Sequence, residues 1–291
     1  MTGGGGTGGD PSVWTALLGT ALSLRYEQVG PWRTRVLEAG TGPETIILMH
    51  GIGGHLEAYA RNMPAFAERY RVIAYDYPGH GFTTHATSDL ELADYVAHLS
   101  DLMDTLGVDR AHLGGESLGG WLAVKFAVRH PERTGKLVLN TPAGALSDPQ
   151  VRERIRSLSQ GAADDPSHER IRARLEWLMA DPTTVSPELI DIRRAVYSRP
   201  GFAESMRHIL CLQDGDVRAR NMITGEDLAT IKNEALVVWT SDDPSGPAGT
   251  GIAMAEQLAN GRFQLIENAG HWPQWEQHAT FNELVLGFLA E

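Results

Sequence analysis

The sequence predicts an α/β fold in which a mostly parallel central sheet carries helices on both faces and is interrupted by a helical insertion. The main support is that short apolar runs alternate with helical patterns along most of the 291 residues, as expected for strands joined by crossover helices. The clearest helix spans 89–107, where apolar residues recur on one face. Residues 145–232 interrupt this alternation, because they read as several helices without a strand.

The individual elements follow in chain order. Residues 1–20 are predicted to be a flexible Gly-rich tail, and the runs 23–29 and 32–40 an antiparallel hairpin at the sheet edge. Further strands are predicted from apolar runs at 45–51, 71–81, 110–117, 136–142, 235–241 and 262–267. Helices are predicted at 57–70, 89–107, 118–129, 250–259 and 275–289. The core therefore comprises 21–144 and 233–291, and 145–232 is predicted to be a helical lid.

Charge and composition limit the classes of partner. The net charge of −12 argues against nucleic acid and anionic membranes, both of which favour basic patches. The predicted lid differs, because it holds 13 of the 25 basic and 14 of the 37 acidic residues; most of its arginines are expected to be solvated. The single cysteine, Cys211, permits no internal disulfide and favours the cytoplasm. No run reaches the roughly 18 apolar residues of a membrane span, and the N-terminus lacks a signal-peptide pattern.

The most informative motif is Gly115-Glu116-Ser117-Leu118-Gly119, a G-x-S-x-G between a predicted strand and a predicted helix. This context is typical of a nucleophile elbow, a turn so sharp that side chains on either side of the serine would collide with neighbouring elements. Ser117 is therefore the candidate nucleophile. A tight structural turn is the alternative interpretation.

A neutral serine needs a base held by an acid, and in this arrangement the chain order is Ser, acid, His. Asp243 follows the strand at 235–241, and His271 follows the strand at 262–267. All three side chains then lie at carboxyl ends of strands, where ligands bind in such sheets. Asp242 is the rival acid, but we favour Asp243 because Pro244 would bend the chain away there.

The loop HGIGGH at 50–55 is expected to complete the site. The backbone N–H groups of Ile52 and Leu118 are the candidate oxyanion donors, and Gly51 is expected to line the substrate site. The loop lacks both G-x-G-x-x-G and a P-loop lysine, and no residues have metal-ligand spacing, so no cofactor or metal is expected.

Together these motifs resemble the α/β-hydrolase superfamily over roughly residues 20–291, through LMHGIGGH, YDYPGHG, GGESLGGW, WTSDDP and AGHWPQWE. The segment 270–289 resembles the C-terminus of the meta-cleavage product hydrolases. This resemblance implies hydrolysis of a carbon–carbon bond in a 2-hydroxy-6-oxo-dienoate from aromatic ring opening, by Ser, Asp and His without a cofactor. It also implies that His271 first helps to ketonise the dienol, after which water or Ser117 adds to the ketone.

Some positions depart from that family. Glu116 stands where the family commonly has asparagine, and Gly54-His55 replace Pro-Gly in the oxyanion loop. The stretch 191–202 resembles the lid segment that carries a carboxylate-binding arginine, with Arg193 as the best match and Arg194 next. Trp272 resembles a pocket-lining tryptophan, although simple packing of the last helix would equally explain it.

The sequence is compatible with three functions. The first is a carbon–carbon hydrolase acting on a small, carboxylated and partly apolar substrate. The second is a carboxylesterase or lactonase with the same machinery, and the third is a binding protein or receptor that keeps the fold. The sequence leaves the formation of a homo-oligomer open.

Overall fold

A computed structural model describes residues 12–291 of the chain. Its centre is an eight-stranded sheet with the order β1-β2-β4-β3-β5-β6-β7-β8. The pairs β1–β2 and β2–β4 are antiparallel, and the remaining pairs are parallel. The strands are β1 (Leu22–Val29), β2 (Trp32–Ala39), β3 (Thr45–Met49), β4 (Arg71–Tyr75), β5 (Ala111–Glu116), β6 (Thr134–Asn140), β7 (Ala235–Thr240) and β8 (Gly261–Ile266). The predicted fold class and its edge hairpin are thus confirmed.

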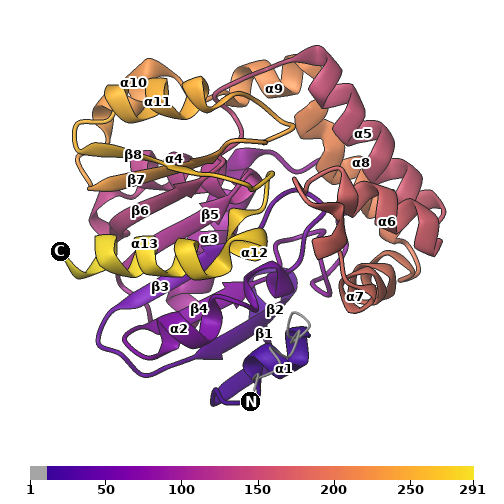
Figure 1. Cartoon of the computed structure of the whole chain (residues 1–291), viewed down its shortest axis with the longest axis horizontal. Helices are drawn as coiled ribbons and strands as arrows, with labels where there is room; N and C mark the ends of the chain where they lie inside the picture. Colours follow the sequence, from indigo (N-terminus) through magenta and orange to yellow (C-terminus); the bar gives the residue numbers. More distant parts are fainter. Residues whose placement is uncertain (1–11) are drawn as a thin grey trace, which may run out of the picture.

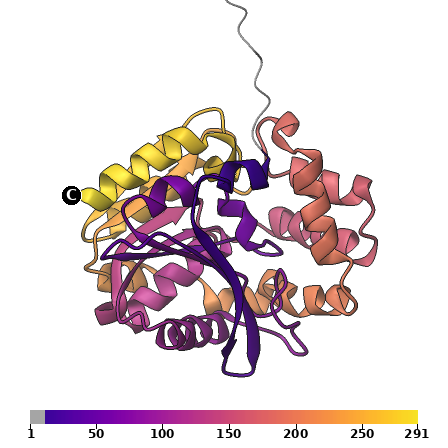
Figure 2. The same cartoon turned by 90° about the horizontal axis from the view of Figure 1, so that it is seen from below.

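Helices cover both faces of this sheet (Figures 1 and 2). Figure 2 shows α2 and α13 on one face and α3 and α4 on the other. The helices outside the insertion are α1 (Val13–Leu17), α2 (Met63–Ala67), α3 (Leu92–Thr105), α4 (Leu118–Arg129), α11 (Ala248–Gln257), α12 (Pro273–Glu276) and α13 (His278–Ala290). Short 3-10 helices span Leu56–Tyr59 and Pro131–Arg133. Because helices cover both faces, every residue of β5 and β7 is buried, which explains their continuous apolar runs.

Residues 145–232 connect β6 to β7 and contain helices but no strand. They comprise α5 (Pro149–Asp164), α6 (His168–Glu176), α7 (Pro187–Tyr197), α8 (Phe202–Ile209), α9 (Gly215–Asn221) and α10 (Gly225–Thr230), with 3-10 turns at Pro182–Thr184 and Leu210–Gln213. Figure 1 shows α5 to α8 gathered beside one end of the sheet. We call 145–232 the insertion; its action as a lid stays a prediction.

The observed helices differ from the predicted ones in three places. The predicted helix 57–70 is a 3-10 turn followed by α2, because Pro64 has no N–H to donate and is placed in the first turn of a new helix. The last helix is divided at Gln277 into α12 and α13. The predicted tail extends too far, because α1 begins after Ser12 and buries Val13 against the core. Residues 1–11 of that tail lie outside the described part of the chain.

Candidate active site

Ser117 occupies a strained turn between β5 and α4. Its φ of 54° and ψ of −111° lie in a backbone region that residues other than glycine rarely adopt. Strain of this kind is typical of functional positions. The flanking glycines are required sterically. A Cβ at Gly115 would lie 2.1 Å from the carbonyl carbon of Gly119, and a Cβ at Gly119 would lie 2.1 Å from the backbone oxygen of Met49. These close approaches explain the glycine pattern around the serine.

His271 and Asp243 are in hydrogen-bond contact. Nδ1 of His271 donates to Oδ1 of Asp243 at 3.0 Å, and the Asp243 side chain is fully buried. Ser245 supports the acid, because its backbone N–H and hydroxyl donate to the same Oδ1 at 2.8 and 2.7 Å. Asp242 is exposed and accepts a hydrogen bond from the Ser241 hydroxyl instead. This geometry favours Asp243 as the acid.

Glu116 approaches the other nitrogen of the same ring. Its Oε1 lies 3.3 Å from Nε2 of His271, and its side chain is 1% exposed. Its second oxygen, Oε2, has no hydrogen-bond partner among residues 12–291. Across the loop, Gly51 leaves room for this carboxylate, since a Cβ there would lie 2.6 Å from Oε1. The imidazole therefore lies between two carboxylates.

These contacts and burial shift the pKa values of both His271 and Glu116. Burial lowers the pKa of His271, but the carboxylates of Asp243 and Glu116 outweigh that effect and raise the pKa above its ordinary value. Burial also raises the pKa of Glu116, against the opposing effects of His271, the Gly51 N–H, Arg174 and Arg193. A proton between Glu116 and His271 is thus held more tightly than either group would hold it in water.

The loop after β3 faces Ser117. His50 is buried, and its Nδ1 donates to the backbone oxygen of Gly51 at 2.8 Å, so this side chain braces the turn. Gly53 has a φ of 67° and its carbonyl accepts from the Tyr197 hydroxyl at 2.9 Å. Ile52 and Leu118 both line space next to Ser117. Their roles as oxyanion donors stay predictions.

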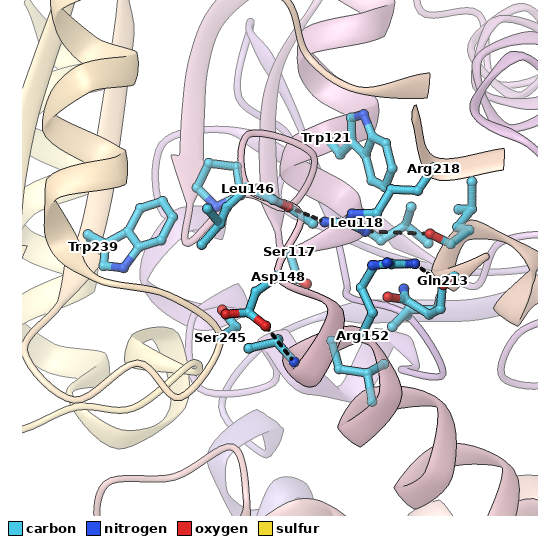
Figure 3. Close-up of a pocket in the computed structure, with 16 residues that line it drawn as sticks. Ser117, Leu118, Trp121, Leu146, Asp148, Arg152, Gln213, Arg218, Trp239 and Ser245 are labelled. Atoms are coloured by element: carbon cyan, nitrogen blue, oxygen red, sulfur yellow. Dashed lines mark hydrogen bonds between the residues drawn. The ribbon is translucent and has the colours of Figure 1, made fainter. Parts of the chain in front are cut away.

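Two pockets meet at Ser117. The first, here called the proximal pocket, is lined by Gly51, Glu116, Arg174, Arg193, His271 and Trp272. The second, the distal pocket, is lined by Trp121, Leu146, Arg152, Gln213, Arg218 and Trp239 (Figure 3). Both include Ile52, Ser117, Ile155 and Ser245. The space between the atoms amounts to about 350 Å³ in the proximal pocket and 610 Å³ in the distal pocket, and it includes space open to solvent.

Two arginines of the insertion are buried in the proximal pocket. Arg193 is 1% exposed; its Nη1 donates to the Tyr197 hydroxyl at 3.3 Å, and its guanidinium carbon lies 5.7 Å from the ring centroid of Trp272. Nε and Nη2 of Arg193 have no hydrogen-bond partner within residues 12–291. Arg174 donates to the Ser159 hydroxyl at 2.9 Å and leaves Nη1 without a partner there. Burial lowers the pKa of Arg174 to about 10.

The site holds residues that the sequence patterns did not reveal. Arg174, Arg152 and Arg218 lie in a helical segment whose arginines were expected to be mostly solvated, and no local pattern distinguishes them. Ser245 follows the acid by two residues, which is the one signal that could have identified it. Arg193, Trp272 and Gly51 line the proximal pocket, whereas Arg194 is exposed and donates to the Pro166 carbonyl.

The insertion also holds the histidine loop. The His271 N–H donates to the Leu178 carbonyl at 2.6 Å, and the Gly270 N–H donates to Oε2 of Glu276 at 2.7 Å. A Cβ at Gly270 would lie 2.3 Å from the Leu178 carbonyl, so glycine is required for this close approach. The position of the general-base candidate therefore depends on the packing of the insertion. Within residues 12–291, no group of three or more His, Cys, Asp or Glu side chains is placed to hold a metal ion.

Comparison with known proteins shows to which family this chain belongs. Residues 44–277 match the model of the alpha/beta hydrolase fold family. A 2-hydroxy-6-oxononadienedioate/2-hydroxy-6-oxononatrienedioate hydrolase of Paraburkholderia phymatum is 35% identical, over 94% of this chain and 93% of its own. A 2-hydroxy-6-oxo-6-phenylhexa-2,4-dienoate hydrolase of Burkholderia cepacia is also 35% identical, over 92% and 95% of the two chains. A crystal structure of a meta-cleavage product hydrolase superposes with a TM-score of 0.81 at 28% identity, covering 91% of this chain and 97% of that one. The chain is a member of the α/β-hydrolase fold family, and these relatives within it are meta-cleavage product hydrolases.

Proposed function

We propose that this protein hydrolyses the carbon–carbon bond next to the ketone of a 2-hydroxy-6-oxo-dienoate, with Ser117, His271 and Asp243 as its catalytic residues. The observation that carries the proposal is their arrangement beside the proximal pocket. The hydrogen-bonded pair His271 and Asp243 lies next to two buried arginines of that pocket. Each of these arginines retains N–H groups without a partner among residues 12–291. A hydrolase of simple neutral esters would have no use for these two charges.

Arg193 and Arg174 supply the binding energy for the dienoate carboxylate. Both guanidiniums are buried, and a buried charge is costly unless a partner compensates it. A substrate carboxylate would accept from their free N–H groups, and a planar guanidinium suits that geometry. Glu116 would repel this carboxylate if both were ionised, and its raised pKa, caused mainly by burial, reduces that repulsion. Trp272 would form an apolar wall for the conjugated chain.

The reaction needs a proton transfer at each of its stages: ketonisation, addition to the ketone and release of the dienolate. Ketonisation moves the proton of the 2-hydroxyl group to the carbon beside the ketone, and His271 is the group placed to relay it. Water or Ser117 then adds to the ketone carbon while His271 takes the nucleophile's proton. When the carbon–carbon bond breaks, its electron pair enters the conjugated 2-oxo chain as a dienolate. His271 returns its proton to the dienolate, which gives a 2-hydroxydienoate. The carboxylic acid is formed directly if water added to the ketone, or by hydrolysis of the acyl-Ser117 ester if the serine added.

Two backbone donors would stabilise the charge that develops on the ketone oxygen. The N–H of Leu118 lies at the N-terminus of α4, and the N–H of Ile52 lies in the facing loop. Such preorganised donors typically contribute about 2.7–4 kcal/mol each to transition-state stabilisation. The His271 ring shows no hydrogen bond to Ser117 within the described residues, as is common before substrate binds and the catalytic hydrogen bonds tighten.

The protein's setting belongs to the same proposal. The substrate is a small carboxylated molecule, and we place the reaction in the cytoplasm because a lone cysteine can form no internal disulfide. None of the helices formed by residues 12–291 has the length and apolar character to cross a membrane.

Product analysis tests the proposal. The protein is incubated with a yellow 2-hydroxy-6-oxo-dienoate in water enriched in oxygen-18. We expect loss of the colour, formation of 2-hydroxypenta-2,4-dienoate and incorporation of the label into the carboxylic acid. Absence of both products, with rapid hydrolysis of a p-nitrophenyl ester, would instead identify a carboxylesterase.

A further inference from the structure

The distal pocket holds two guanidinium groups that the proposed chemistry does not use. Arg152 comes from α5 and Arg218 from α9, and both line the same pocket as Ser117. Figure 3 shows them with Gln213 on one side of the pocket, while Trp239 and Ser245 lie on the other. The two charges repel each other, and Arg152 is one cause of the lowered pKa of Arg218, after burial. The Trp121 ring compensates part of the Arg218 charge, because the guanidinium carbon lies 5.0 Å from its centroid.

Main-chain carbonyls accept hydrogen bonds from only some of the N–H groups of each guanidinium. Arg218 is 6% exposed and donates to the Leu146 and Leu212 carbonyls at 2.7 and 3.5 Å, but its Nε has no partner. Arg152 donates to the Gln213 carbonyl at 2.8 Å, and its Nε also has no partner. These statements apply to residues 12–291. Each guanidinium therefore keeps one buried N–H without an acceptor among these residues.

Within the described residues, no carboxylate neutralises the two arginines. Over residues 12–291, no Asp or Glu oxygen lies within the 4.0 Å of an ion pair with either arginine. Asp148 lines the same pocket, but its Oδ1 accepts from the backbone N–H groups of Gln150 and Val151 at the start of α5. The distal pocket thus has a net positive charge beside apolar walls formed by Trp121, Leu146 and Trp239.

We propose that the distal pocket binds the acyl portion of the substrate and that Arg152 and Arg218 hold an anionic group, a carboxylate, on the side of the pocket that they share with Gln213. The apolar walls accommodate the acyl chain next to Ser117, and the guanidinium N–H groups donate to the carboxylate that the chain carries. This inference rests on the proposed function, because the acid released by cleavage is then a dicarboxylate. The two carboxylates of the substrate would then lie one in each pocket, with the scissile bond at Ser117 between them.

Esters with acyl chains of equal length test the subsite without requiring carbon–carbon cleavage. p-Nitrophenyl hemiadipate and p-nitrophenyl hexanoate differ in the charge at the far end of the acyl group. We expect Arg152→Gln and Arg218→Gln each to lower kcat/KM for the hemiadipate at least about 10-fold, as expected when a hydrogen bond to a charged group is lost. The value for the hexanoate should change less than about 2-fold. Arg154→Gln, an exposed arginine two residues along α5, is the matched control and should change neither.

Equal losses on both esters would assign the arginines to the fold and overturn the proposal, as would no loss on either. If Arg218→Gln fails to fold, inhibition of the wild-type protein replaces it. Succinate, glutarate or adipate should then compete with substrate at concentrations at least about 10-fold lower than the monocarboxylates of equal length. The proposal would be overturned if none of the three dicarboxylates inhibited more strongly than the monocarboxylate of equal length. A preference for charged acyl groups without turnover of any dienoate would retain the subsite and reject the proposed function.

Discussion

The Glu116 carboxylate lies 3.3 Å from Nε2 of His271, on the side of the ring opposite Asp243. Nε2 is the atom that must be unprotonated to accept a proton from Ser117 or water. A carboxylate at this position favours a proton there, so it opposes the resting state that the reaction requires. It also provides a second proton site beside the base, within a reaction that needs more than one proton transfer.

This relationship predicts the pH dependence of turnover. The pKa of His271 is raised, so the neutral base forms only at a pH above the ordinary histidine value of about 6.5, and kcat/KM should fall below that higher pH. Glu116→Gln removes one of the carboxylates that raise this pKa, and the acid limb of the profile should move to lower pH. The profile is measured with an uncharged ester, to avoid titration of the substrate. Asp242→Asn, which removes an exposed charge, is the control; an unmoved limb in Glu116→Gln would contradict the prediction.

Ser117 and His271 should be individually essential. We expect Ser117→Ala and His271→Ala each to lower kcat at least about 10³-fold, since either change disables the same proton-transfer unit. Circular dichroism and thermal unfolding check that each variant still folds. Turnover close to that of the wild-type protein in either variant would remove that residue from the assignment.

The acid should be Asp243. Asp243→Asn should lower kcat on the order of 10³- to 10⁴-fold, because an amide no longer fixes the histidine tautomer or stabilises its cation. Asp242→Asn should leave kcat within about 2-fold, because its side chain is exposed and accepts its hydrogen bond from the neighbouring Ser241 rather than from His271. The comparison of the two neighbours is its own control, and the reverse ranking would transfer the role to Asp242.

The proximal arginines should recognise a carboxylate. Arg193→Gln and Arg174→Gln should each lower kcat/KM for a carboxylated dienoate at least about 10-fold, through loss of a charge-assisted hydrogen bond. A small uncharged ester should be hydrolysed with little change, because it offers nothing for either arginine to hold. Arg194→Gln, whose side chain is exposed on the same helix as Arg193, is the matched control. Equal losses on both substrates would indicate that these arginines pack the insertion instead.

The fold and part of the candidate site could be predicted from local sequence patterns. The elbow around Ser117 depends on glycines a few residues away, and Asp243 and His271 each follow an apolar strand, so short windows carry the signal. Arg174, Arg152 and Arg218 could not be identified in this way. The burial of Arg174 and Arg218, and the place of the half-buried Arg152 in the distal pocket, depend on how the helices of the insertion pack against the sheet. The contact between Glu116 and His271 joins residues 155 positions apart and is equally invisible to local patterns.

Relative turnover of two substrates with the same acyl group tests the central proposal most directly. The wild-type kcat/KM is measured for a 2-hydroxy-6-oxo-dienoate and for the p-nitrophenyl ester of the acid that its cleavage would release. We predict efficient cleavage of the dienoate, with both activities lost in Ser117→Ala. Hydrolysis of the ester at a normal enzymatic rate, with no decay of the dienoate above its spontaneous rate, would contradict the proposed carbon–carbon hydrolase.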